Sequence, residues 1–102
     1  MPDLSPEAPT IENAAGGRQS DTGVLLLETP KALLRVGSVF DYGAKKYARG
    51  NWKKIEVEAH INHVLVHLYA HLAGDRQDDH LGHALCRMLM AMETDIETGD
   101  LL

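Results

Sequence analysis

The chain has 102 residues, 44% of them apolar, and a formal net charge of -5 at pH 7. This length supports one small domain with a thin core, and the acidic balance argues against binding to duplex nucleic acid. The single cysteine, Cys86, excludes an internal disulfide and fits a reducing compartment, and the apolar residues around it indicate a packed thiol. Because the sequence has neither a signal peptide nor an apolar run of membrane-spanning length, we expect a cytoplasmic protein without a membrane partner.

The sequence of the first part of the chain predicts little regular structure. Residues 1–22 contain proline, glycine and small polar residues without apolar periodicity, which predicts a flexible arm that is disordered or extended. The apolar run from Val24 to Leu27 is too short to assign, and we expect a short strand or an extended segment there. Pro30 is typical of a helix start, and the apolar spacing after it predicts a first helix to Tyr42 or a little beyond.

The middle of the chain is basic and aromatic. Seven of the ten basic residues lie between Lys31 and Lys54, where Asp41 is the only acid, so this stretch attracts anions. Aromatic faces can stack a nucleobase while lysine and arginine meet its phosphates. The alternative is that the aromatic rings cap a small core and the lysines are merely solvated. The candidate nucleotide-binding residues are Lys45, Lys46, Tyr47, Arg49, Asn51 and Trp52.

Two further helices are predicted, from Val57 to Ala73 and from His80 to about Asp95. Gly74 is a good C-terminal stop for the first of them, and Asp78 or Asp79 supplies an N-cap for the second. The short link between the two helices predicts that they are antiparallel neighbours.

The predicted fold is therefore all-α, a small helical bundle of about three helices behind an N-terminal arm. We expect residues 23–96 to form a single helical nucleotide-binding domain and residues 97–102 to form an acidic tail. A core this small predicts that the bundle is completed by homo-oligomerisation.

All six histidines fall within residues 60–83. On a helix His60, His67 and His71 lie within about 40° of one another and about 100° from an apolar stripe. The stripe comprises Ile61, Leu65, Leu68 and Leu72, and the next helix repeats it with Leu81, Leu85, Met88 and Met92. We expect these stripes to be buried against each other, with the histidines along the edges of one seam. Alternatively, each histidine is a structural hydrogen-bonding residue.

The seam would suit a metal ion, a phosphate or an acid/base group. Histidines four residues apart on a helix can chelate zinc or a similar metal, whereas magnesium prefers the oxygens of the aspartates in the link. The sequence has neither a Gly-x-Ser-x-Gly motif nor a phosphate-binding glycine-rich loop, so water would have to be the nucleophile.

A series of motifs carries a family resemblance. The chain contains, in order, Gly43-Ala44-Lys45-Lys46-Tyr47, Asn51-Trp52, His67-Leu68, Gly74-Asp75 and His80-Leu81-x-His83-Ala84. With shorter matches before them, these motifs resemble the phage-type dATP/dGTP diphosphohydrolase N-terminal domain family over about three quarters of the chain. The resemblance implies metal-dependent release of pyrophosphate from a purine deoxynucleoside triphosphate. It also implies a bacteriophage or prophage protein that acts in the host cytoplasm.

Residue chemistry and resemblance together give a first hypothesis for the site. Catalytic roles fall to His60, His67 and His83. The ligands expected for a divalent ion, Mg²⁺ or Mn²⁺, are Asp75, Asp79 and His80.

Three positions depart from the family pattern. Val24 stands where such sequences have lysine, Val66 where they have arginine, and Arg87 where they have asparagine. These departures motivate a second hypothesis, a noncatalytic phage protein that binds or sequesters a nucleotide. A third is a small interaction module in which the histidines are the polar edge of a helix pair.

Overall fold

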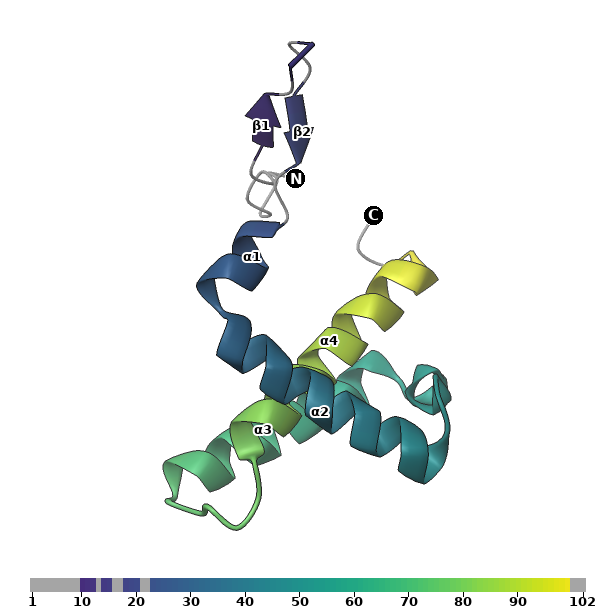
Figure 1. Ribbon diagram of the computed structural model, residues 1–102. Coiled ribbons are helices and arrows are strands. Elements are labelled where there is room, and N and C mark those ends of the chain that lie inside the picture. Colours follow the sequence, from purple (N-terminus) through teal and green to yellow (C-terminus); the bar gives the residue numbers. More distant parts are fainter. Residues whose placement is uncertain (1–9, 13, 16–17, 21–22, 100–102) are drawn as a thin grey trace, which may run out of the picture. The chain divides into compact units, whose positions relative to one another are not determined.

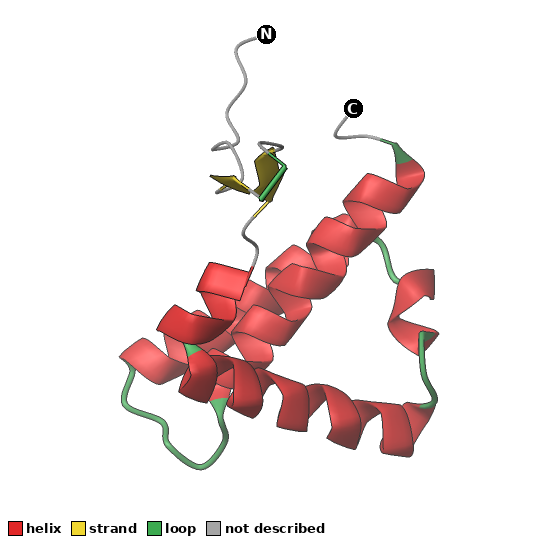
Figure 2. Ribbon diagram, turned by 45° about the horizontal axis from the view of Figure 1, so that its top comes forward, coloured by secondary structure: helices red, strands yellow, loops and turns green. Residues whose placement is uncertain are grey.

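The computed structural model describes residues 10–12, 14–15, 18–20 and 23–99. The chain divides into two compact units, residues 1–33 and 34–102. Four α-helices account for most of the described residues, which confirms the predicted all-α class (Figure 1; Figure 2). No helix in these described parts is long and apolar enough to cross a membrane.

The first unit contains a short antiparallel hairpin that the sequence did not predict. Strand β1 (Thr10–Glu12) pairs with β2 (Arg18–Ser20), with Thr10 opposite Ser20. Both strands lie in the region expected to be a disordered or extended arm. Each strand has three residues, so the hairpin adds only a small element to an otherwise helical chain.

Helix α1 (Gly23–Glu28) corrects one prediction. We expected a short strand or an extended segment from Val24 to Leu27, but the three consecutive leucines are helical, in keeping with the high helix propensity of leucine. The hydroxyl of Thr29 donates a hydrogen bond to the carbonyl of Leu25 over 2.7 Å. Helical hydrogen bonding therefore continues past the last residue of α1.

The remaining helices match the predicted order. Helix α2 (Pro30–Tyr47) begins at the predicted proline and continues past the expected end at Tyr42. A 3-10 helix that was not predicted, η1 (Asn51–Lys54), follows it. Helices α3 (Val57–Leu72) and α4 (His80–Thr98) then form an antiparallel pair, the most extensive helix packing in the described part of the second unit (Figure 1).

The turn between α3 and α4 depends on local backbone chemistry. Gly74 has a φ of +93°, which a residue without Cβ adopts at little cost. Asp79 is the N-cap of α4, and its carboxylate accepts a hydrogen bond from the amide of Gly82 over 3.0 Å. A Cβ on Gly82 would collide with that carboxylate, which would have to move away from its capping position.

Helix α2 crosses one side of α4 (Figure 1; Figure 2). The thiol of Cys86 donates a hydrogen bond to the carbonyl of Val36 over 3.3 Å, and both residues are buried. Burial raises the pKa of the Cys86 thiol to about 11. Cys86 is thus the packed thiol that the sequence predicts.

The prediction of which faces are buried is wrong for α3 and α4. All eight residues of the two apolar stripes are exposed, by 37% to 81%. The α3/α4 seam instead contains small or polar buried residues, namely His60, Val64, His80, Ala84 and Ala91. Alanines allow the two helices to approach closely, and imidazole rings fill the space between them. The large apolar side chains are consequently directed away from the seam.

Candidate functional site

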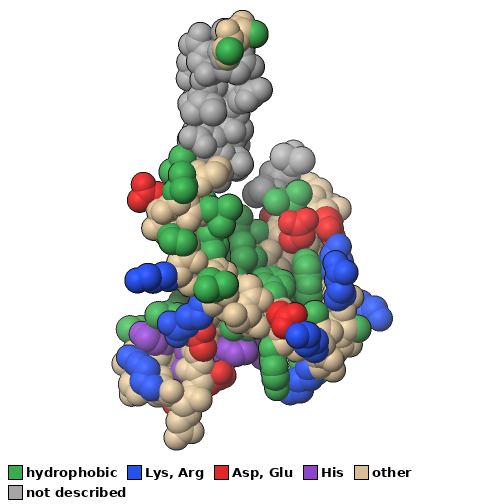
Figure 3. All heavy atoms as spheres, viewed as in Figure 1, with side chains coloured by type: hydrophobic (Ala, Val, Ile, Leu, Met, Phe, Trp, Pro, Cys, Tyr) green, Lys and Arg blue, Asp and Glu red, His purple; other side chains and the backbone are tan. Residues whose placement is uncertain are grey.

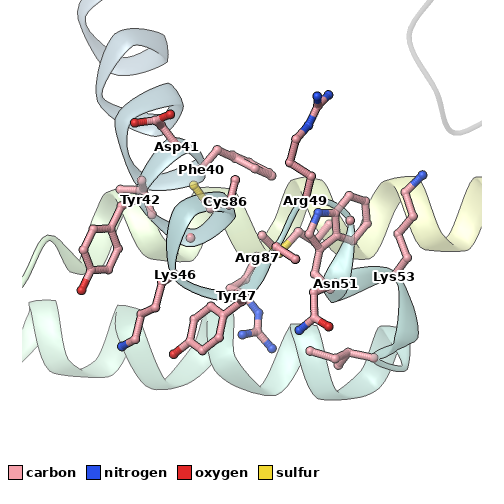
Figure 4. Close-up of a pocket in the computed structure, with 18 of the residues that line it drawn as sticks. Phe40, Asp41, Tyr42, Lys46, Tyr47, Arg49, Asn51, Lys53, Cys86 and Arg87 are labelled. Atoms are coloured by element: carbon pink, nitrogen blue, oxygen red, sulfur yellow. The ribbon is translucent and has the colours of Figure 1, made fainter.

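An open pocket of about 1100 Å³ lies where α2 ends and η1 begins (Figure 4). Its walls come from the C-terminal half of α2, the loop after it, η1 and the first half of α4. Five of the six predicted nucleotide-binding residues line it: Lys46, Tyr47, Arg49, Asn51 and Trp52. The sixth, Lys45, is not among the lining residues and forms an exposed ion pair with Asp41 over 2.8 Å.

The backbone between α2 and η1 turns sharply. Ala48 has a φ of +116° and is the only non-glycine residue with positive φ in the described parts of the chain. Gly50, with a φ of +74°, precedes η1. A strained backbone of this kind costs about 1 to 3 kcal/mol and concentrates at functional sites. The turn returns the chain toward α4, so that Trp52 and Arg87 line one pocket.

Aromatic and basic side chains alternate around the pocket. The ammonium of Lys46 lies 5.1 Å from the ring centre of Tyr47, and that of Lys53 lies 5.7 Å from the ring of Trp52. Hydrogen bonding to Tyr47 raises the pKa of Lys46, which keeps this lysine charged. Arg49 points to the opposite side of the pocket from Lys46 (Figure 4). The pocket therefore offers cations on more than one side.

Arg87 is a charged pocket residue that we did not assign to the site from the sequence. It lines the pocket from α4, and its Nε is buried without a hydrogen-bond partner among the described residues. Burial lowers the pKa of its guanidinium, because the charged form loses hydration. Arg87 is four residues after His83 and therefore on the same helix face, which could have indicated that it belongs to the site. We instead interpreted Arg87 as a departure from the family pattern. Val66, another departure, is exposed and does not line the pocket.

A cluster of three histidines and two aspartates lies at the end of the α3/α4 pair that holds their connecting turn. The Nδ1 atoms of His67 and His80 are 2.9 Å apart, and Nε2 of His80 lies 2.8 Å from a carboxylate oxygen of Asp75. His83 stacks on His67 with ring centres 5.1 Å apart, and its Nε2 lies 3.3 Å from a carboxylate oxygen of Asp78. Figure 3 shows histidines next to acidic side chains on this part of the surface. The predicted convergence of histidines from both helices is therefore present.

The hydrogen bonds in this cluster determine where its protons lie. The carboxylate of Asp75 can only accept, so Nε2 of His80 donates to it. In neutral His80 the Nδ1 atom is then an acceptor, and His67 donates its Nδ1 proton to it. This leaves Nε2 of His67 with a free lone pair. Burial is the main reason for the lowered pKa of His67, which keeps the ring neutral and able to accept a proton.

A group of ligand atoms from His67, Asp78 and His80 lies within 4.8 Å of one another. Asp75 lies outside this group but holds the second nitrogen of His80, an arrangement typical of histidines that bind metals. Two imidazoles and one carboxylate suit a borderline divalent ion better than Mg²⁺.

Two of the predicted site residues have other partners in this structure. Asp79, expected as a metal ligand, accepts two hydrogen bonds from Arg35 and caps α4, and these bonds lower its pKa. His60, expected to be catalytic, is fully buried, and its Nε2 donates to the carbonyl of Trp52 over 3.0 Å. His60 therefore ties α3 to η1 and helps to position Trp52.

His83 connects the pocket with the cluster. It lines the pocket, contacts His67 through stacked rings and pairs with Asp78. A ligand in the pocket would consequently lie next to the group that can accept a proton.

Comparison with known proteins gives one match. Residues 12–101 match the family model described as dATP/dGTP diphosphohydrolase, N-terminal. No curated protein and no solved structure is similar enough to the chain to count as a match.

Proposed function

Because the chain belongs to the dATP/dGTP diphosphohydrolase N-terminal family, we propose that it binds a purine deoxynucleoside triphosphate and hydrolyses it to the monophosphate and pyrophosphate. The observation that carries the proposal is the position of His83, which is shared by the aromatic and basic pocket and by the histidine cluster. Substrate binding and proton transfer can thus take place side by side.

The pocket supplies recognition. The ring of Tyr47 or Trp52 stacks the purine, because every nucleobase presents a flat π-face. Lys46 and Arg87 bind the phosphates, and Arg87 gains the most from an anion because its buried Nε has no hydrogen-bond partner among the described residues and has already lost hydration. Asn51 offers both a donor and an acceptor to the base or the sugar.

The cluster supplies the acid/base group. In this proposal Nε2 of His67 accepts a proton from water as the water oxygen bonds to the α-phosphorus. The bond from that phosphorus to the bridging oxygen breaks, and pyrophosphate leaves with the electron pair. His80 and Asp75 hold His67 in the required tautomer through their hydrogen bonds.

The same cluster is the candidate site for the divalent metal ion. His67, Asp78 and His80 would hold it, and their two nitrogen donors favour Mn²⁺ over Mg²⁺ among the two ions expected. A neutral imidazole has one lone-pair nitrogen, so with the ion bound His67 would be a ligand and not the base. Such an ion would supply Lewis-acid stabilisation of phosphate charge. Asp79 is not included, because Arg35 and the α4 N-terminus already engage its carboxylate.

A pyrophosphate-release assay tests the proposal. We expect the wild-type chain to release pyrophosphate from dGTP or dATP with Mn²⁺, and His67→Ala to lower the rate about 100-fold or more, the range of general-base catalysis. Lys45→Met is the matched control for Lys46→Met, because Lys45 lies outside the pocket. Absence of product from every purine triphosphate, with every divalent ion tried, would refute hydrolysis.

The noncatalytic alternative rests on one observation, the pocket guanidinium of Arg87, whose Nε has no hydrogen-bond partner among the described residues. It would hold an anion whether or not turnover follows. A nucleotide that binds tightly, depends on Arg87 and is recovered unchanged would favour this sequestering function.

We also propose that the protein acts as a homo-oligomer. The buried apolar residues in the described parts of the chain are few and mostly small: Val36, Val64, Ala84, Cys86 and Ala91. A single copy with such a core buries little apolar surface.

A further inference from the structure

In the described part of the chain, the α3/α4 pair leaves large apolar side chains exposed. They are Ile61, Leu65, Leu68 and Leu72 on α3, and Leu81, Leu85, Met88 and Met92 on α4. Even the least exposed of them keeps 37% of its surface accessible. Scattered exposed leucines are ordinary on a protein surface, but two stripes at regular helical spacing on adjacent helices are not.

Both stripes lie on the same side of the helix pair. On α3 the stripe is about 90° from the direction of His60 and Val64, the residues in the seam. On α4 the offset from Ala84 and Ala91 is about 80°, in the same rotational sense. Because the helices are antiparallel, equal offsets in the same sense place the two stripes side by side. They form one continuous surface, which we call the leucine face.

Helix α2 does not cover the leucine face. It contacts α4 through Cys86, whose direction on that helix is about 130° from the stripe. Helix α2 thus lies on another side of the α3/α4 pair. No described residue of the second unit covers the leucine face.

We propose that the leucine face binds the leucine face of a second copy, so that two α3/α4 pairs form a four-helix bundle. The proposal rests on the homo-oligomer proposed above and identifies its interaction surface, and it is independent of the nucleotide chemistry. A face that is apolar throughout is complementary to itself, as a two-fold interface requires. A helix pair buries such a face by packing on another layer of helices. The large apolar side chains of both copies would then form the core of the bundle.

The size of the leucine face fits a dimer. Helix α3 has 16 residues, so at about 1.5 Å per residue the face is about 24 Å long, and two helices about 10 Å apart make it about 20 Å wide. Its footprint is thus about 480 Å² per copy. If the face is treated as flat, the two copies together bury about 1000 Å² of accessible surface in the dimer. This area reaches the lower limit of a specific protein–protein interface, about 1000 Å².

Sedimentation velocity with the full chain tests the proposal. We expect a wild-type dimer of twice the 11.2 kDa chain mass. Leu65→Asp should weaken the dimer by at least about 100-fold, because the two-fold axis buries a carboxylate from each copy without a partner. Leu34→Asp is the matched control, since Leu34 lies on α2 and is 75% exposed outside the leucine face. This variant should remain dimeric.

A milder pair of variants covers the case in which Leu65→Asp does not fold. Leu65→Ala and Leu85→Ala remove apolar surface without adding charge, and each should weaken the dimer about 10-fold to about 100-fold while helicity is retained. A monomeric wild type overturns the proposal. So does a dimer that these alanine variants leave unchanged, or one that Leu34→Asp disrupts as strongly as Leu65→Asp.

Discussion

Replacing Arg87 by methionine should weaken nucleotide binding and stabilise the fold in one step. The buried Nε of Arg87 has no hydrogen-bond partner among the described residues, so the free protein bears an uncompensated desolvation cost. Methionine has a similar apolar length and leaves no large cavity. The two effects have opposite signs, which separates an anion-binding residue from a purely structural one.

The magnitudes follow from the burial of this one group. A hydrogen bond to a charged group is worth about 1.5 to 3 kcal/mol, so Kd for a purine triphosphate should rise about 10-fold to about 150-fold. Removing an unpaired buried polar group should return about 1 kcal/mol of stability, or about 4 to 8 °C in Tm for a domain of this size. Calorimetric titration gives the first quantity, and thermal unfolding without ligand gives the second.

Lys45→Met is the control for this experiment, because it also removes one positive charge but lies outside the pocket. It should leave Kd nearly unchanged. If Arg87→Met lowers Tm and leaves Kd unaltered, the guanidinium has a structural partner, and the reasoning from its burial is refuted.

Three further predictions concern stability and reactivity. Burial lowers the pKa of His60 and His67 below the ordinary value of 6.5. As the pH drops, these histidines are therefore protonated in the unfolded chain before they are protonated in the folded one, and the free energy of unfolding should fall below about pH 6.5. Equal unfolding midpoints at pH 7.5 and 5.5 would contradict this. Gly82→Ala should cost about 1 to 3 kcal/mol in denaturant unfolding, because its Cβ displaces the carboxylate that caps α4, and an unchanged midpoint would exclude the clash. The Cys86 thiol, buried and with its pKa raised to about 11, should react with a thiol reagent at pH 8 only after unfolding; fast labelling of the native protein would disprove its burial.

Local signals in the sequence located most of the elements. The start at Pro30, the stop at Gly74 and the cap at Asp79 all depend on chemistry within a few residues, and the structure contains each of them. The basic and aromatic segment could also be recognised, since five of its six predicted residues line one pocket. The helix at Gly23–Glu28 was missed because a four-residue apolar run has no readable period.

The sequence indicated which residues would lie close together, but not which partners each of them has. Sequence spacing placed His67, His80 and His83 on facing helices, and they do meet. Asp79 was chosen as a ligand only because it is next to His80 in the sequence. Once α4 begins at His80, the N-cap geometry directs the Asp79 carboxylate back onto its own helix, where Arg35 also holds it.

The sequence by itself determined where α2, α3 and α4 lie, that a short link joins α3 and α4, and which segments hold the basic, aromatic and histidine residues. Only the tertiary structure decided which helix faces meet. A helix with an apolar stripe beside a histidine line can bury either one, and the small side chains of Ala84 and Ala91 favour the histidines, because they let imidazole rings fit between the helices. Periodicity reports that a face needs burial, but it does not report whether the covering surface belongs to the same chain.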